Sequence, residues 1–162
     1  MAAMSRYSPA RRIASNSSQR GGDRIQRRRL HRATFVLAGI YNLLWGLYAA
    51  IDPQYVFRFA GMEPMVPPQI FACLGMVVGL YGILYLEVAR VPERGFVLAA
   101  VGLAGKVLGP IGLLVLIVRG DWPVETLILC LTNDFIWWVP FGLYLLDSRR
   151  SHPASPDKNP PP

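Results

Sequence analysis

The sequence predicts an all-α integral membrane protein, folded as an antiparallel bundle of four transmembrane helices with disordered tails. Hydrophobic residues make up 52% of the 162-residue chain, while charged residues make up 17%, below the roughly 25% usual for soluble domains. Most charges lie in the two tails and one short loop. Four nearly uncharged stretches remain. The length of each is close to that of a helix that crosses a bilayer, which needs about 20 apolar residues.

The four expected spans follow one another with short connections, and they cover residues 33–51, 69–89, 95–118 and 123–146. Helix-breaking residues stand at the boundaries: "DP" follows the first span, "VPPQ" precedes the second, "VPERG" separates the second from the third, and "RGDWP" precedes the fourth. Because short connections make consecutive helices antiparallel neighbours, we expect an up-and-down bundle.

The first span is expected to remain in the mature protein. Its apolar core of 19 residues is longer than the roughly 7–15 residues of a signal-peptide core. The "LYAAID" that ends it is a poor match to the small-x-small pattern of a cleavage site. We therefore interpret it as a transmembrane helix.

The charged tails predict the orientation in the membrane. Residues 1–32 form a basic arm and residues 147–162 a proline-rich tail, and both are predicted to be disordered because they contain little apolar surface. Apart from the mid-span Lys106, basic residues lie in or beside these tails or in the "VPERG" loop, and only Arg58 and Arg119 lie on the other side. The positive-inside rule then places both termini in the cytoplasm, and we expect a bacterial inner membrane.

The net charge of +7 is explained by the same basic arm, which holds nine of the seventeen Lys and Arg residues. Anionic lipid attracts basic residues beside a membrane helix by about 1 kcal/mol each. Anionic lipid is therefore the expected partner of the arm, and binding to nucleic acid is not expected.

Small residues recur at helical spacing on three of the spans, where they allow helix backbones to approach closely. The predicted helix-packing positions are Gly39, Gly46, Gly75, Gly79, Gly82, Gly102 and Gly109. Since similar stripes occur on three helices of one chain, packing within the chain is the favoured interpretation. A homodimer that uses Gly75 and Gly79 is the alternative.

Polar residues stand halfway along three of the spans. Lys106 is the twelfth of 24 residues in the third span, and Asp134 is the twelfth of 24 in the fourth. Asn42 is the tenth of 19 residues in the first span, and Asn133 precedes Asp134. A charge at the centre of a membrane helix costs about 2.5–3.5 kcal/mol. We therefore expect a Lys106–Asp134 ion pair at a central polar site, with Asn42 or Asn133 supplying further hydrogen bonds.

This central polar site has two interpretations, and the sequence favours neither. A buried ion pair fixes the register of packed helices. Alternatively, the site binds a small polar or anionic ligand beside Lys106, or relays a proton between Asp134 and water. Trp137, Trp138 and Phe141 follow on the fourth span, either as the wall of such a ligand site or, preferably, as anchors at the membrane interface.

Redox and metal chemistry have little support in the sequence. Cys73 and Cys130 are single cysteines in apolar spans without a CxxC motif, so we interpret them as small apolar side chains. A redox pair of these two thiols is the alternative. His31 and His152 lie in the expected tails and no Cys/His cluster has zinc spacing, so no metal, haem or other cofactor is expected.

The segments "LAGIYNLLWGLYAAIDPQYVFRFAGMEP", "PQIFACLGMVVGLYGILY", "GLAGKVLGPIG" and "NDFIWWVPF" resemble a family of small bacterial four-helix membrane proteins. Its members are often called alkyl hydroperoxide reductase, and their layout is similar to that of DoxX-like membrane proteins. The resemblance covers residues 36–146 and implies a four-helix membrane module with a redox-associated role. The peroxide-reducing activity does not carry over, because both cysteines lie in apolar spans and not in a thioredoxin-like fold.

The predicted function is therefore that of a small multi-pass membrane protein with a binding, transport-accessory or complex-subunit role and no visible enzymatic core. A homo-oligomer or a larger membrane complex is the expected setting. One alternative is a thiol- or quinone-linked redox enzyme that uses Cys73 and Cys130. Another is a purely structural partner subunit.

Overall fold

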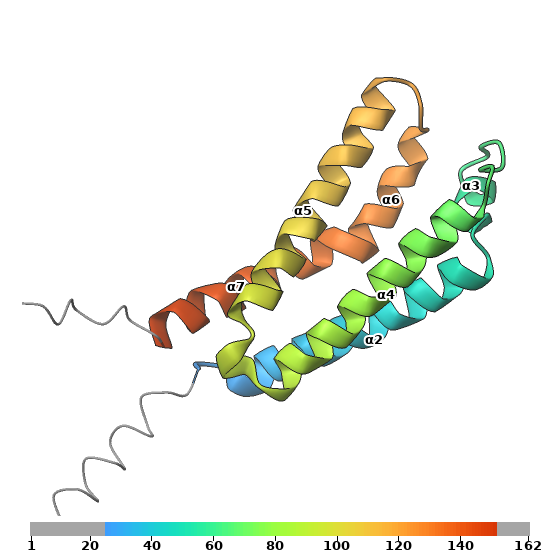
Figure 1. Ribbon diagram of the computed structural model, residues 1–162. Helices are drawn as coiled ribbons and strands as arrows, with labels where there is room; N and C mark the ends of the chain where they lie inside the picture. Colours follow the sequence, from blue (N-terminus) through green and yellow to red (C-terminus); the bar gives the residue numbers. More distant parts are fainter. Residues whose placement is uncertain (1–24, 152–162) are drawn as a thin grey trace, which may run out of the picture.

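The computed structural model describes residues 25–151, and all the regular structure in that range is helical (Figure 1). Four segments are long and apolar enough to cross a membrane, namely α2 (Arg28–Ile51), α4 (Gln69–Arg90), α5 (Phe96–Val118) and Val124–Ser151. The predicted all-helical class and the four apolar helices are therefore confirmed.

The fourth segment is not a uniform α-helix. It consists of a 3-10 turn η2 (Val124–Thr126), a short α6 (Leu127–Cys130), a π-helical turn η3 (Leu131–Phe135) and α7 (Ile136–Ser151). Two short elements occupy the connections, α3 (Tyr55–Phe59) between α2 and α4, and η1 (Pro92–Arg94) between α4 and α5.

Helices α2 and α4 make the most extensive helix contact in the described chain, and they lie side by side in Figure 1. A Cβ atom added to Gly46 would lie 2.6 Å from the Gly75 carbonyl oxygen and 2.6 Å from Gly79 Cα. One added to Gly82 would lie 2.6 Å from the Gly39 carbonyl oxygen. These glycines bring the two backbones into direct contact. Gly75 and Gly79 are thus covered by α2 of the same chain, as the favoured interpretation expected.

An aromatic core joins α2, α4 and α7 near the end where both ends of the described chain lie, which we call the base. The Phe35 ring centroid lies 4.5 Å from that of Phe141 and 4.8 Å from that of Tyr144, and the centroids of Tyr85 and Phe141 are 5.1 Å apart. All four side chains are almost completely buried. The end of α7 is therefore held against the α2–α4 pair.

A second aromatic cluster joins the helices at the opposite end, which we call the tip. The Phe57 ring of α3 lies 5.3 Å from Phe71 of α4 and 5.6 Å from Trp122, which precedes η2. Trp45 and Leu129 pack against the same cluster, from α2 and α6. The α2–α4 pair forms one half of the described molecule, and the segment from α5 to α7 forms the other. The two halves are thus packed together at the base and at the tip.

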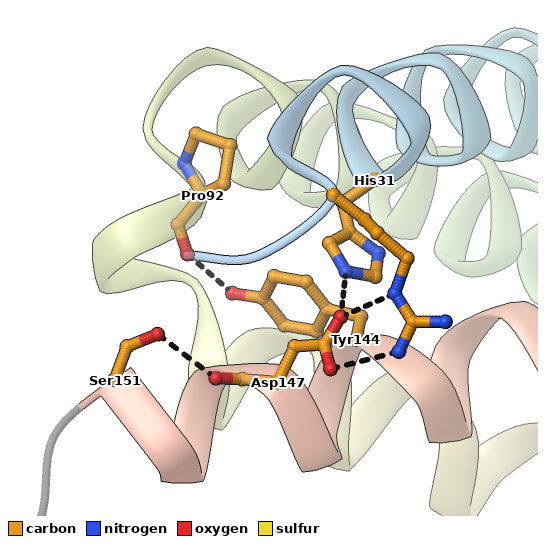
Figure 2. Close-up of polar contacts among 6 residues, drawn as sticks. His31, Pro92, Tyr144, Asp147 and Ser151 are labelled. Carbon is orange, nitrogen blue, oxygen red and sulfur yellow. Dashed lines mark hydrogen bonds and ion pairs between the residues drawn. The ribbon is translucent and has the colours of Figure 1, made fainter. Parts of the chain in front are cut away.

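A buried polar network closes the base, where Figure 2 shows the His31 ring beside the Asp147 carboxylate and the Tyr144 hydroxyl directed at the Pro92 carbonyl. The Asp147 carboxylate accepts hydrogen bonds of 2.9 Å from Nε and Nη2 of Arg27, and it lies 2.9 Å from Nε2 of His31. The hydroxyl of Tyr144 donates to the Pro92 carbonyl at 2.7 Å. His31 and Asp147 are both fully buried.

This network explains where two helices extend beyond the expected spans. Helix α2 begins at Arg28 and not at Ala33, and α7 continues to Ser151 beyond Leu146. Both extensions contain residues that the sequence assigned to the tails, because their apolar content is low. The remaining parts of the predicted tails, residues 1–24 and 152–162, lie outside the described residues.

We expect Gly46→Ala to destabilise the protein by about 1–3 kcal/mol, because the added methyl group would push the α2 and α4 backbones apart. Gly112→Ala is the matched control, since a Cβ at Gly112 meets no atom within 4 Å. It should be neutral or slightly stabilising, because alanine favours helix more than glycine. Unfolding in bilayer-like detergent measures both effects, and equal stability of the two variants would contradict this account of the packing.

We expect Asp147→Ala to lower the free energy of unfolding by about 1–3 kcal/mol, because it leaves the buried His31 ring without its partner. The control is Asp121→Ala, whose carboxylate is exposed and lies 3.9 Å from Arg119. An exposed pair of this kind contributes little, so this change should stay within about 0.5 kcal/mol. Denaturant titration of the two variants makes the comparison, and a neutral Asp147→Ala would show that the network does not hold the base.

Candidate functional site: a polar cavity at mid-span

A cavity of about 330 Å³ lies between the α2–α4 pair and the half formed by α5 and η3. Its volume is at the small end of the range of about 300–1,000 Å³ typical of ligand pockets. The polar side chains that line it are Asn42, Tyr81, Tyr85, Lys106, Asn133 and Asp134. The structure therefore brings together all four residues of the predicted central polar site and adds two tyrosines.

Glycines of α5 leave part of this space empty. A Cβ added to Gly105 would meet no atom within 4 Å, and one added to Gly109 would meet only the Asp134 carboxylate, at 3.9 Å. Gly102 differs, because a Cβ there would lie 2.6 Å from the Tyr85 ring. The predicted packing role therefore fits Gly102, whereas Gly109 lines the cavity without close packing.

Lys106 has its shortest contact with a backbone group. Its Nζ donates to the Asn133 carbonyl oxygen at 2.5 Å, and it lies 3.9 Å from Oδ1 of Asp134. The two charged side chains are only 6% and 9% exposed. The sequence predicted a direct ion pair, and in the structure this pair is a long contact beside a short hydrogen bond to the backbone.

The π-helical turn η3 supplies both partners of Lys106. A π turn bonds each N–H to the carbonyl five residues earlier and commonly occurs at functional sites. This departure from α-helical bonding leaves carbonyl groups open to side-chain donors, and the Asn133 carbonyl accepts such a bond. The π-helical bonding of this turn was not predicted from the sequence, because polar residues within an apolar span are compatible with an ordinary α-helix as well.

Two buried amide oxygens at the cavity have no hydrogen-bond partner within residues 25–151. They are Oδ1 of Asn42 and Oδ1 of Asn133. Asn42 is only 3% exposed, and both residues line the cavity. An unpaired buried polar atom costs about 1–3 kcal/mol, and most such atoms in native proteins are paired.

The three aromatic residues that follow Asp134 support the helices around the cavity but are not among its lining residues. Trp138 donates from Nε1 to the Lys106 carbonyl oxygen at 3.0 Å, which links α7 to α5. The ring of Trp137 lies 5.9 Å from Tyr41 of α2, and Phe141 belongs to the core at the base. These residues therefore do not form the ligand wall that was the alternative interpretation, and the burial of Trp137 and Phe141 within the bundle also differs from the preferred role as interface anchors.

The two cysteines have different environments. Cys73 is exposed on α4, whereas Cys130 is buried close to the Asp134 carboxyl group. Both are free thiols. Among the described residues, no group of three His, Cys, Asp or Glu side chains is arranged to hold a metal ion.

Larger hollows lie elsewhere on the described part of the molecule, but their linings are different. One of about 740 Å³ beside α6 is mostly apolar, with Phe59, Ile128 and Leu131 in its wall. Another of about 450 Å³ at the base contains Arg149, whose guanidinium lies 5.5 Å from the centre of the Phe96 ring. Neither is lined by Asn42 or Asn133, which carry the unpaired amide oxygens.

Tyr81 and Tyr85 line the cavity but were not predicted from the sequence. They follow Val78 at helical spacing, so the three residues share one face of α4 at the depth of the polar layer. That spacing was a usable signal. Asp147 at the base was missed for another reason, since an acidic residue beside "RR" at the end of a span resembles an ordinary solvated charge.

Comparison of the chain with protein-family models, with curated proteins and with solved structures finds no match. The resemblance to small four-helix membrane proteins of DoxX-like layout therefore stays a prediction from the quoted segments. Function has to be argued from the mid-span cavity and its chemistry.

Proposed function

We propose that this chain is an integral membrane protein whose antiparallel four-helix bundle binds a small lipid-soluble molecule at mid-depth. The observation that carries the proposal is the mid-span cavity, which is lined by Lys106, Asp134 and two asparagines whose buried amide oxygens have no partner among the described residues. Of the binding, transport-accessory and complex-subunit roles predicted from the sequence, this proposal chooses binding.

Insertion in a membrane is supported by the outer faces of the helices. Large apolar side chains such as Leu37, Leu44, Leu80 and Leu108 are more than half exposed along α2, α4 and α5. Apolar surface on this scale is unusual on a soluble monomer and is favourable in lipid. Helices of this length and hydropathy fit the thickness of a bilayer.

Contacts between glycines support the antiparallel arrangement. Gly39 meets Gly82, and Gly46 meets Gly75, so residue numbers rise along α2 as they fall along α4. The basic residues at the base, including Arg28 and Arg149, would then lie on the cytoplasmic side of a bacterial inner membrane.

The cavity is accessible from the membrane side in this arrangement. Leu74 and Val77 of α4 border it and are about half exposed, and the exposed Gly105 of α5 presents no side chain opposite them. A ligand dissolved in the bilayer would therefore enter between α4 and α5. The thiol redox alternative lacks comparable support, because Cys73 is exposed while Cys130 is buried.

Photolabelling in nanodiscs tests this function. The probe is hexadecanol with a mid-chain diazirine, present as a minor component of the lipid. We expect cross-links to concentrate on peptides that contain the cavity residues of α4 and α5. Gly105→Leu, which fills open space beside Lys106, should reduce that labelling about tenfold.

Gly112→Leu is the matched control, because Gly112 is equally open but is not among the cavity residues. It should leave the labelling pattern unchanged. Even labelling of all outward helix faces, insensitive to Gly105→Leu, would overturn the proposed function.

A further inference from the structure

We propose that the ligand is a neutral amphiphile whose polar head bears hydroxyl groups, and that the amide oxygens of Asn42 and Asn133 recognise these hydroxyls as hydrogen-bond acceptors. This inference rests on the proposed function of the cavity. It selects the polar form of the small polar or anionic ligand that was predicted beside Lys106 from the sequence.

The orientation of both amides is fixed by their own hydrogen bonds. Nδ2 of Asn42 donates to the Val78 carbonyl at 3.3 Å, and Nδ2 of Asn133 donates to Oδ1 of Asp134 at 3.1 Å. If either amide were turned over, its oxygen would face another oxygen. What each residue leaves unpaired is therefore an acceptor, and only a donor can satisfy it.

The charges of the site favour a neutral donor. Lys106 and Asp134 carry opposite charges and lie 3.9 Å apart, so the site as a whole is neutral. An anionic head would face the Asp134 carboxylate and two amide oxygens, whereas a cationic head would face Lys106. Burying an uncompensated charge is far more costly than burying a hydrogen-bonded polar group.

A hydroxyl group also suits the remaining capacity of Lys106. The ammonium has three N–H donors, and the Asn133 carbonyl accepts one of them at 2.5 Å. A hydroxyl donates one hydrogen and accepts through two lone pairs. It can therefore donate to an asparagine oxygen while it accepts from Lys106. Two unpaired oxygens correspond to two donors, which a diol head supplies.

The apolar part of the ligand is accommodated by the opening between α4 and α5. Leu74 and Val77 present apolar side chains there, and Gly105 and Gly109 leave room on the opposite helix. A single saturated or isoprenoid chain fits this description. The membrane-facing opening selects for lipid solubility and the asparagines select for hydroxyl groups.

The test is a competition against the diazirine probe in nanodiscs. The competitors are 1-O-hexadecylglycerol, whose head has two hydroxyls, and its dimethyl ether, which has the same chain and no donor. We expect the ether to compete about a hundredfold more weakly, because it lacks both donors and each good hydrogen bond to a buried acceptor contributes about a factor of ten. If the ether competes as well as the diol, the hydroxyl inference is wrong while the proposed function stands. If neither competes, the proposed function itself fails.

Variants of the two asparagines test whether they recognise the polar head of the ligand. Asn42→Leu and Asn133→Leu each remove one of the two acceptors, and each should lower the diol-to-ether ratio about tenfold while the ether still competes. Thr132→Val is the control on the same turn, because Thr132 is exposed and is not among the cavity residues, and it should keep the wild-type ratio. Retention of the full ratio in both asparagine variants would overturn the assignment. The wild-type comparison decides the inference even if one variant does not fold.

Discussion

Close contact between the backbones of α2 and α4 is the constraint around which the other helices are arranged. The contact is made by glycines, which have no side chain to keep the two helices apart: Gly39, Gly46, Gly75 and Gly82. In lipid, apolar side chains gain nothing from leaving the solvent, so association depends on close van der Waals packing and on polar contacts. The α2–α4 pair therefore acts as a firm unit, and α5 and α7 have to find other ways to attach to it.

They attach at the two ends. At the base, the rings of Phe35, Phe141 and Tyr144 pack together, and Asp147 ties Arg27 and His31 to the end of α7 (Figure 2). The hydrogen bonds that Arg27 donates to Asp147 raise the pKa of the Arg27 guanidinium further above its usual value, so this partner stays charged. At the tip, aromatic rings of α3 and α4 meet Trp122. The mid-span cavity lies between these two attachments.

The parts of this arrangement that the sequence predicted are those with a strong periodic signal. Four apolar spans and the glycine stripes of α2 and α4 follow from composition and spacing, because each residue type there has one common role. Lys106, Asp134, Asn42 and Asn133 could be placed at one depth by counting inward from the span boundaries. All four line the same cavity in the structure.

The parts that the sequence did not predict depend on geometry between distant residues. The π turn η3 contains polar residues that an α-helix accepts equally well, and it brings the Asn133 carbonyl closer to Lys106 than the Asp134 carboxylate. The partnership of His31 with Asp147 joins residues 116 positions apart, and each looks like a tail residue by itself. Gly105 and Gly109 resemble the packing glycines of α2 and α4, yet they face empty space, because nothing in the sequence reports the distance to the opposite helix.

The empty space beside Lys106 lowers the stability of the bundle, and no packing contact elsewhere in the described bundle depends on it. Larger apolar residues at Gly105 and Gly109 would fill it, and apolar residues in place of Asn42 and Asn133 would remove two unpaired acceptors, each of which costs about 1–3 kcal/mol. A sequence shaped only by stability would favour those changes, since stabilising substitutions are common in natural proteins. The Lys106–Asp134 pair uses the Asn133 carbonyl and the Asn133 amide nitrogen, but it uses neither the open space nor the two amide oxygens. The proposed hydroxyl-bearing ligand would account for both the open space and the acceptors, whereas a role in helix register would account for the charged pair and its hydrogen bonds to Asn133.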